Sequence, residues 1–454
     1  MGSIKVTRLL HAGYIFEDES SSIIFDPIFE NPFSINCYAY PSLEFDVAEI
    51  KKLKFSAIFI SHFHDDHCSF ESLNLLNKQT PIYIYCLNLE MLKLLEELGF
   101  SHVFALELGQ SVKIGNLTVT PHRALDEEVD CIFQISNSEV NILNVVDAWI
   151  DYDKVKELST VKWHLVLWPF QTMRELEVLS PKRFAKFNTD LPFEWVDQLK
   201  QLNPLNLVPS SCQFINEEWS WYNNAYYPIS YKSFLEIMKV ELPKTEIFKM
   251  NSGSVLSLKS EKLDWHNSLN WIKLTSSVDV DYDYQPNKEV PSTAEVAKNF
   301  QALSEVQKQQ VSVYCNKSIL EKLNNLDFSH EPYFQTENFL WRLKVYESSG
   351  SKVNIYDYIK VESRFKLLNS PANHDAVCWL TEVVDFKLWS GLYNSEAMTS
   401  LYLRINDVNL SAIYEKNIKE VSLTEDPLIR LLYDDSFASY QKKQLEKIRT
   451  TVSF

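Results

Sequence analysis

The chain has 454 residues, 45% of them hydrophobic and 13% aromatic, which is enough for about two or three domains with sizeable cores. Its formal net charge is −17, from 61 acidic and 44 basic residues. This balance argues against non-specific nucleic-acid binding, because that binding needs positive charge to neutralise phosphates. With only eight glycines, the chain also lacks a glycine-rich phosphate-binding loop.

The cysteines and the apolar runs bear on the compartment. Seven cysteines are scattered along the chain, and none belongs to a Cys-x-x-Cys pair. An odd number of isolated cysteines is typical of reduced thiols in a cytoplasm. No apolar run approaches membrane-spanning length, and residues 1–5 lead into a strand pattern without an apolar signal segment. We therefore expect a cytoplasmic protein with no membrane span.

The first half of the chain alternates strand and helix patterns. Apolar segments bounded by polar turns predict strands at residues 4–10, 14–16, 22–25, 55–60, 81–86, 103–106, 111–114, 117–120, 131–135, 140–146, 164–170 and 205–209. Apolar residues at helical spacing predict helices at residues 46–53, 70–77, 88–98, 152–158, 191–202 and 231–240. Such alternation indicates an α/β domain.

One stretch, Ser61-His62-Phe63-His64-Asp65-Asp66-His67, follows the strand predicted at 55–60. Because side chains alternate along an extended chain, His62 and His64 point the same way. Imidazole nitrogens and a carboxylate oxygen are ligands that zinc, iron and manganese accept. A histidine-rich surface turn is the alternative, and the preceding apolar strand disfavours it. The stretch therefore predicts a metal site.

The residues His62, His64, Asp66 and His67 resemble the His-x-His-x-Asp-His signature of the metallo-β-lactamase superfamily. The resemblance implies an α/β fold, the αββα sandwich, here with an additional C-terminal α+β domain. It also implies that His62 and His64 bind a first metal ion, and that Asp66 and His67 bind a second. The pattern looks most like the branch of ascorbate-6-phosphate lactonases and N-acyl-phosphatidylethanolamine phospholipases, and it also resembles the corresponding part of CMP-N-acetylneuraminate hydroxylase.

The same resemblance implies further ligands downstream of the motif. His122 follows a predicted strand and takes the place of the third histidine, with Asp126 as its substitute. Asp147 ends the strand predicted at 140–146 and takes the place of the bridging carboxylate. Asp26 is either a partner of the metal-binding loop or a turn starter before a proline. His11, in a His-Ala-Gly turn, is expected to be structural rather than a ligand.

The chain departs from the superfamily pattern near residue 211. Superfamily hydrolases place a last metal-binding histidine at a strand end in this region, whereas this chain has Ser211 and Cys212. We expect these two residues to contact the substrate. Either the second metal has fewer protein ligands, or a distant residue such as His266 substitutes, or only one metal binds. The aromatic run at 219–227 either walls the substrate site or packs in the core.

The second half of the chain has a different sequence pattern and carries no further metal motif. We predict a metallo-β-lactamase-like domain at 1–255, a linker at 256–290 and an α+β accessory domain at 291–454 that serves as a substrate-binding, lid or dimer-contact unit. Within the accessory domain, strands are expected at 338–347, 352–358, 376–385, 401–405 and 408–411, and helices at 294–310, 427–433 and 439–448.

These features predict a metallo-hydrolase acting on a small-molecule ester, lactone or phosphodiester. Two divalent metal ions, zinc first and iron or manganese as alternatives, would hold a hydroxide that attacks the substrate, and Asp66 would orient it as the catalytic residue. One alternative is a di-iron oxidoreductase or oxygenase on the same fold. Another is a non-enzymatic binding protein with a residual metal site. A homo-oligomer remains open.

Overall fold

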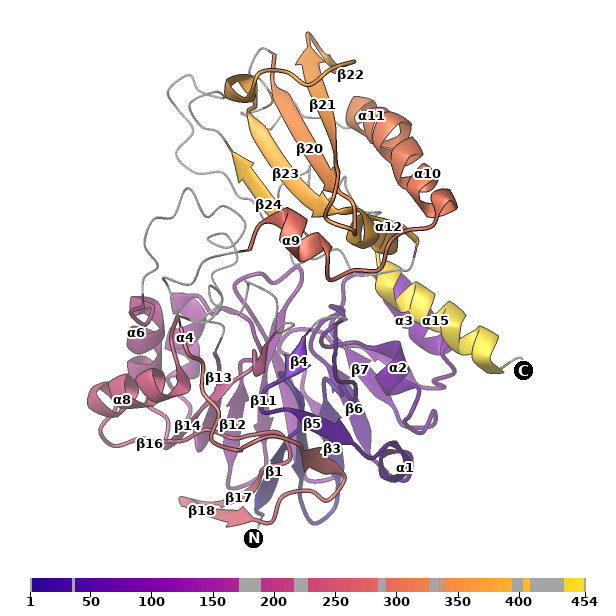
Figure 1. Cartoon of the computed structure of the whole chain (residues 1–454). Coiled ribbons are helices and arrows are strands. Elements are labelled where there is room, and N and C mark those ends of the chain that lie inside the picture. The colour runs from indigo at the N-terminus through magenta and orange to yellow at the C-terminus, as the bar shows by residue number, and fades with distance from the viewer. Residues whose placement is uncertain are drawn as a thin grey trace.

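The computed structural model describes residues 2–34, 37–170, 189–215, 228–284, 291–325, 334, 338–393, 403–408 and 437–452. Two large sheets face each other, with helices on their outer sides, and a smaller sheet with its own helices stands beyond one edge of this sandwich (Figure 1). The predicted aromatic wall at 219–227 and the predicted helix at 427–433 lie outside the described residues.

The first large sheet has eight strands. In spatial order they are β18 (Lys262–His266), β17 (Val255–Lys259), β1 (Ile4–Arg8), β2 (Tyr14–Glu17), β3 (Ser22–Phe25), β6 (Ala57–Ile60), β7 (Ile82–Ile84) and β8 (Val103–Ala105). The strands from β18 to β3 pair antiparallel, and those from β3 to β8 pair parallel. The parallel half therefore brings the ends of β3, β6 and β7 to one edge.

The second large sheet has seven strands. In spatial order they are β16 (Glu246–Ile247), β14 (Asn206–Ser210), β13 (Leu165–Pro169), β12 (Asn141–Asn144), β11 (Cys131–Ser136), β10 (Leu117–Arg123) and β9 (Val112–Ile114). Strands β12, β13 and β14 pair parallel. Two short pairs complete the sandwich, namely β4 (Tyr38–Ala39) with β15 (Phe214–Ile215), and β5 (Leu43–Phe45) with β19 (Ile272–Leu274).

The alternation of side chains explains the layers. In β6, Ala57 and Phe59 enter the core between the two sheets, whereas Ile58 and Ile60 enter a second core beneath the helices. The same parity holds in β13, where Leu165 lies in the inner core and Val166 in the outer one. A strand that is apolar on both faces must be covered on both sides. The pattern therefore requires four layers, and the predicted αββα sandwich is confirmed.

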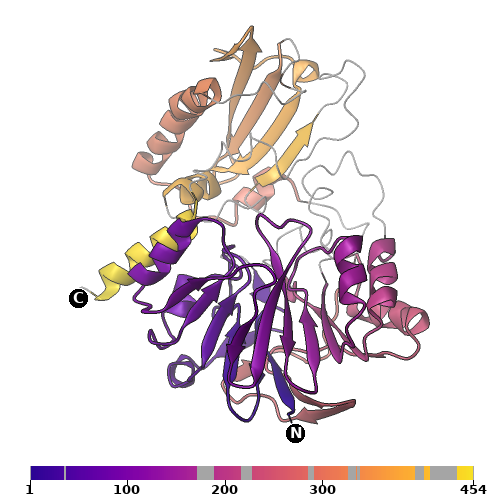
Figure 2. The same cartoon turned by 180° about the vertical axis from the view of Figure 1, so that it is seen from behind.

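Helices cover the outer faces of both sheets (Figures 1 and 2). The sandwich helices are α1 (Val47–Ile50), α2 (Phe70–Leu73), α3 (Leu89–Glu97), α4 (Tyr152–Leu158), α6 (Phe193–Leu202) and α8 (Tyr231–Glu241). Capping fixes where several of them start. Asp151 accepts a hydrogen bond from the Lys154 backbone N–H and begins α4 as expected, and Asn88 caps α3 in the same manner.

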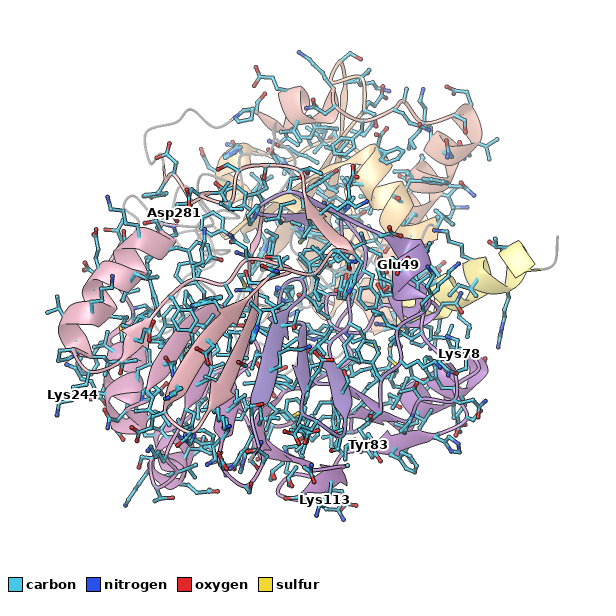
Figure 3. All side chains as sticks on the ribbon, turned by 90° about the horizontal axis from the view of Figure 1, so that it is seen from below. Glu49, Lys78, Tyr83, Lys113, Lys244 and Asp281 are labelled. Atoms are coloured by element: carbon cyan, nitrogen blue, oxygen red, sulfur yellow. The ribbon has the colours of Figure 1, made fainter. Side chains whose placement is uncertain are left out.

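The sandwich extends past the predicted boundary at residue 255. That boundary falls at the first residue of β17, which pairs with β1, and β18 pairs with β17 in turn. Beyond these strands, Asp281 accepts hydrogen bonds from the backbone N–H groups of Tyr231 (2.7 Å) and Lys232 (2.9 Å) at the start of α8 (Figure 3). Much of the range 256–290 is thus bound to the sandwich, because its strands and caps have partners there.

The accessory unit is built on a five-stranded mixed sheet. Its spatial order is β22 (Arg364–Leu367), β21 (Val353–Val361), β20 (Leu340–Tyr346), β23 (Trp379–Val384) and β24 (Leu403–Val408). Its helices are α9 (Thr293–Ala297), α10 (Glu305–Val313), a π-helical turn (Tyr314–Ser318), α11 (Ile319–Asn325), a 3₁₀ turn (His374–Ala376) and α12 (Asp385–Tyr393). An additional α+β unit is therefore present, with its own apolar core.

Two details of this half differ from the sequence expectations. The single helix expected at 294–310 is two helices, α9 and α10, because Ser304 forms a capping box with Gln307 and starts a new helix. The last helix, α15 (Ser439–Val452), packs on α2 and α3 of the sandwich rather than on the accessory sheet (Figures 1 and 2). Among the described residues, no helix has the length and apolarity needed to cross a membrane.

Candidate metal centre

Loops that leave the strand ends of both sheets meet at one edge of the sandwich. Asp26 follows β3, and His62 follows β6 after Ser61. From the second sheet, Asp147 follows β12 and Cys212 follows β14. The hydrogen bonds described below join these loops across the two sheets. Polar side chains that are far apart in the sequence are therefore collected at this edge.

The backbone around this edge is strained. His11 (φ 53°), Asp26 (φ 40°), Val146 (φ 62°), Ser211 (φ 57°) and Cys212 (φ 45°) all adopt left-handed conformations without being glycine. A β-branched residue such as Val146 rarely tolerates this conformation. Such residues persist only where the surrounding structure holds them, and they cluster at functional sites.

Five of the six predicted metal ligands converge into two groups. The first group consists of His11, Asp66, His67 and Asp147. The second group consists of His62, His64 and Asp66. Within each group the ligand atoms lie within 4.8 Å of one another. Asp66 belongs to both groups, so one carboxylate joins two neighbouring positions for a cation.

Asp26 fixes the orientation of His67. The backbone N–H of Ser61 donates to Asp26 Oδ1 (2.8 Å), and the hydroxyl of Ser61 donates to Oδ2 (2.8 Å). His67 Nδ1 lies 3.0 Å from the same Oδ2. Since a carboxylate only accepts, His67 carries a proton on Nδ1, and in the neutral ring the Nε2 atom that faces the first group carries the lone pair. Asp26 was expected to be either a partner of the metal-binding loop or a turn starter before a proline. In the structure it is a hydrogen-bond partner of that loop.

His11 lies in the first group, but its tautomer makes it a donor. The backbone N–H of Cys212 donates to His11 Nδ1 (3.1 Å), so a neutral His11 carries its proton on Nε2. That Nε2 lies 3.1 Å from Asp66 Oδ2 and 3.7 Å from Asp147 Oδ2. The same Nε2 lies 3.1 Å from His67 Nε2. We infer that the Nε2–H of His11 donates within this group, to Asp66 Oδ2 or His67 Nε2, rather than ligating a metal.

The charges of the two groups favour a bound cation. Burial lowers the pKa of His67, but the carboxylates of Asp147 and Asp66 outweigh burial and hold the pKa well above 6.5. Burial, with the neighbouring His67 and His64, holds the pKa of His62 well below 6.5, so its ring is neutral, as a metal ligand must be. The carboxylates of Asp66 and Asp147 are only partly exposed, and such converging carboxylates repel one another unless positive charge lies between them. The donor atoms and the charge therefore fit divalent metal ions.

Asp130, which the sequence reading overlooked, lies beside the second group but is not a member of it. Its Oδ1 lies 3.7 Å from His62 Nδ1. Burial, together with the nearby charge of Asp147, raises the pKa of Asp130 to about 6. Asp130 directly precedes β11, so the only sequence signal was its place in the acidic segment that begins at Asp126. Asp130 is therefore a neighbouring carboxylate, and ligation by it would need its side chain to move toward the second group.

The structure does not bring His122 into either group. Leu117 and Val119 of β10 point into the inner core, and so His122 lies on the other face of the strand. There its Nε2 lies 3.3 Å from Gln134 Oε1, and its pKa is lowered by burial. Its substitute Asp126 has an exposed side chain and is also outside both groups.

Ser211 and Cys212 lie behind the centre with fully buried side chains. The hydroxyl of Ser211 accepts a hydrogen bond from the Phe170 backbone N–H (3.3 Å), and Cys212 touches the centre through its backbone N–H. Substrate contact by these two residues stays a prediction. His266 lies on β18 with its Nε2 2.8 Å from Ser257 Oγ, and it belongs to neither group.

Two variants test whether His122 or Asp130 contributes to metal binding on the His62 side. We expect His122→Ala to leave the metal content unchanged, because its ring faces Gln134. We expect Asp130→Ala to weaken metal binding about tenfold or more, because a carboxylate near His62 is lost. Elemental analysis after dialysis against a weak chelator measures both. Loss of metal from the His122 variant alone would restore the sequence-based assignment.

Comparisons with known proteins give matches to solved structures. No protein-family model matches the chain. A search of curated protein sequences finds no match either. An isothiocyanate hydrolase from Delia radicum gut bacteria is 16% identical with a TM-score of 0.42, and the match covers 56% of this chain and 99% of that protein. The metallo-β-lactamase fold protein YhfI from Bacillus subtilis is 13% identical with a TM-score of 0.38, covering 57% and 100%.

A third match is CmlA, a diiron β-hydroxylase from Streptomyces venezuelae. It is 13% identical with a TM-score of 0.38, and the match covers 57% of this chain and 54% of that protein. Independently of these matches, the chain shows two facing sheets, outer helices and a histidine–aspartate centre where the strand-end loops meet. The N-terminal part of the chain is therefore an αββα sandwich that carries this centre at one edge.

Proposed function

We propose that this protein is a metal-dependent hydrolase with two adjacent metal positions. The observation that carries the proposal is the convergence of six side chains, five of them predicted ligands, into two groups that share Asp66. Nitrogen and oxygen donors of this kind suit zinc, manganese and iron. We propose zinc as the first candidate, and an ester, lactone or phosphodiester of a small molecule as the substrate.

The chain's own residues have separate tasks in this proposal. Asp26 keeps the proton of His67 on Nδ1, and His11 Nε2 lies within hydrogen-bond distance of Asp66 Oδ2 (3.1 Å) and helps to orient that carboxylate. Bound metal ions would lower the pKa of water and polarise the bond to be broken. His64 is exposed, whereas His62 and His67 are buried, so the substrate approaches from the His64 side. Asp66, shared by both groups, sets the distance between the two positions.

A di-iron oxidoreductase is the second candidate, and one observation favours it. The last histidine of the hydrolase pattern is missing, and a carboxylate, that of Asp130, lies beside His62 within reach of a small side-chain movement. A donor set richer in carboxylates shifts preference toward harder ions such as manganese and iron. The fold alone does not choose between the two reactions.

The reducing compartment expected from the cysteines belongs to the same proposal. All seven cysteines lie in the described residues, all are buried, and no disulfide joins them. Burial also holds the pKa of Cys212 well above its ordinary value, so its thiol stays protonated beside the centre. These observations support a cytoplasmic protein whose cysteines pack as small apolar side chains.

Metal analysis of the purified full-length protein, expressed without added metal, tests the function. Two equivalents of zinc or manganese, with hydrolysis of a compound from ester, lactone and phosphodiester panels, would support the hydrolase. Two equivalents of iron and an optical band in anaerobically purified protein would support the oxidative reading. A protein that takes up no metal after reconstitution and turns over no panel compound would contradict both.

A further inference from the structure

The C-terminal helix α15 lies beside the loop that carries the metal motif. We call residues 61–69 the metal-binding loop. Figures 1 and 2 both show α15 alongside α3, and α15 also contacts α2, which starts directly after this loop. Between α15 and the motif there are more than 370 residues of chain. The contact is therefore purely tertiary.

Gln441 of α15 reaches into the metal-binding loop. Its Nε2 donates to the backbone oxygens of Phe63 (2.8 Å) and Cys68 (3.0 Å). Those two carbonyls flank the segment that contains His64, Asp66 and His67. The residue is only 2% exposed, so water does not substitute readily for its amide. One side chain thus ties both ends of the ligand-bearing segment together.

Two further contacts fix α15 to the same loop. Gln444 Oε1 accepts from the Phe70 backbone N–H (2.7 Å), and its Nε2 donates to Ser69 Oγ (3.2 Å). The ring of Phe437, just before α15, packs on the ring of Phe63 with centroids 4.8 Å apart. Phe63 stands between His62 and His64, so this packing bears directly on two ligands.

The metal-binding loop has little regular structure of its own. The described backbone hydrogen bonds that lie wholly within the loop run from the N–H groups of His67 (3.1 Å) and Cys68 (2.8 Å) to the oxygen of His64, which makes a single turn. Asp26 holds the loop at Ser61 and His67, and the Ser34 hydroxyl holds it at Asp65 (2.5 Å). Gln441 donates side-chain hydrogen bonds to the backbone oxygens of Phe63 and Cys68. These two bonds connect the residues on either side of the ligand-bearing segment 64–67.

We propose that Gln441 is a positioning residue of the metal centre, and that the docked helix α15 sets the metal affinity by holding His64 and His67 at ligand distance. The inference rests on the proposed metal function of the loop. Ligands held in place before binding lose less conformational freedom when the ion arrives, so the loop without Gln441 binds metal more weakly.

The ion pairs on the outer face of α15 provide a matched control. Lys447 pairs with Glu71 (2.6 Å), and Arg449 pairs with Glu97 (2.9 Å), both with largely exposed side chains. Exposed pairs of this kind contribute little to stability. Lys447→Ala therefore changes the same helix without touching the metal-binding loop.

The test is a Co²⁺ titration of the metal-free, full-length protein followed by visible absorption. Gln441→Glu keeps the size of the side chain but removes its donor, and Gln441→Ala removes the whole amide. We expect both to weaken Co²⁺ binding about tenfold and to change the ligand-field bands. Lys447→Ala should match the unmodified protein in affinity and in spectrum. Equal affinities in all four proteins would overturn the proposal.

Hydrogen exchange of the metal-free proteins gives a second readout that does not depend on metal. We expect faster exchange in peptides covering residues 61–70 of the Gln441 variants, and unchanged exchange in β20 and β23 of the accessory unit. Faster exchange everywhere would show general destabilisation and would count against a positioning role. If the unmodified protein binds no Co²⁺, the proposed metal function fails, while the exchange data still decide whether Gln441 orders the loop.

Discussion

Replacement of Asp66 by alanine is expected to empty both metal positions and to lower hydrolysis by roughly three orders of magnitude or more, since bound metal contributes several kcal/mol to the reaction. The effect is large because Asp66 is the one side chain shared by the two groups. Its side chain is 27% exposed, so the variant should stay folded. Elemental analysis and turnover of the best panel substrate measure the two losses.

Asp65, the neighbouring aspartate, provides the control for Asp66. It is buried, its Oδ2 accepts a hydrogen bond from the Ser34 hydroxyl, and it belongs to neither group. Burial, with the charge of Asp66, raises the pKa of Asp65 to about 6, so a neutral replacement costs little. Asp65→Asn should therefore retain both metals. An Asp66→Ala protein that still holds two metals would refute the shared role of Asp66.

Asp26→Asn is expected to weaken metal binding by about 10- to 100-fold while leaving the fold intact. Asparagine has the same size and tolerates the left-handed backbone at this position (φ 40°). Its oxygen can still accept from the Ser61 backbone N–H, which leaves its amide nitrogen facing His67 Nδ1. That nitrogen only donates, so the His67 proton moves to Nε2 and blocks the ligand lone pair.

Nitrogen NMR of labelled histidine reports the tautomer of His67 directly, and a metal titration reports the affinity. Ser61→Ala serves as a comparison, because it leaves the carboxylate of Asp26 unchanged and removes the hydroxyl that contacts Asp26 Oδ2 (2.8 Å) and His62 Nδ1 (2.9 Å). We expect a smaller loss of affinity in Ser61→Ala than in Asp26→Asn. Unchanged metal affinity in Asp26→Asn would show that Asp26 serves only as the turn starter before Pro27.

The centre could be predicted from sequence where its ligands are local or end a strand. His62, His64, Asp66 and His67 lie within six residues, and the apolar strand β6 before them fixes where they begin. Asp147 follows β12, and the carboxyl ends of parallel strands share one edge. These assignments needed only the strand pattern and the chemistry of the side chains.

The assignment of His122 shows where that reasoning stops. A histidine near the end of a strand meets the same criterion as Asp147, but the parity of β10 turns His122 away from the two groups. The parity was readable from Leu117 and Val119, yet which face of β10 points inward depends on how the two sheets pack. Asp130 was overlooked because it ends an acidic loop that has no periodicity.

By itself, the sequence determined the two-sided apolar strands, the alternation of strands and helices, and a metal motif on a strand end, because each depends on residues close together in the chain. Only the tertiary structure decided the tautomers of His11 and His67, the position of Asp130 beside His62, and the hydrogen bonds of Gln441 to the metal-binding loop. These depend on contacts between residues as much as 378 positions apart. Such contacts form only when the sheets and α15 pack, and no local pattern encodes them.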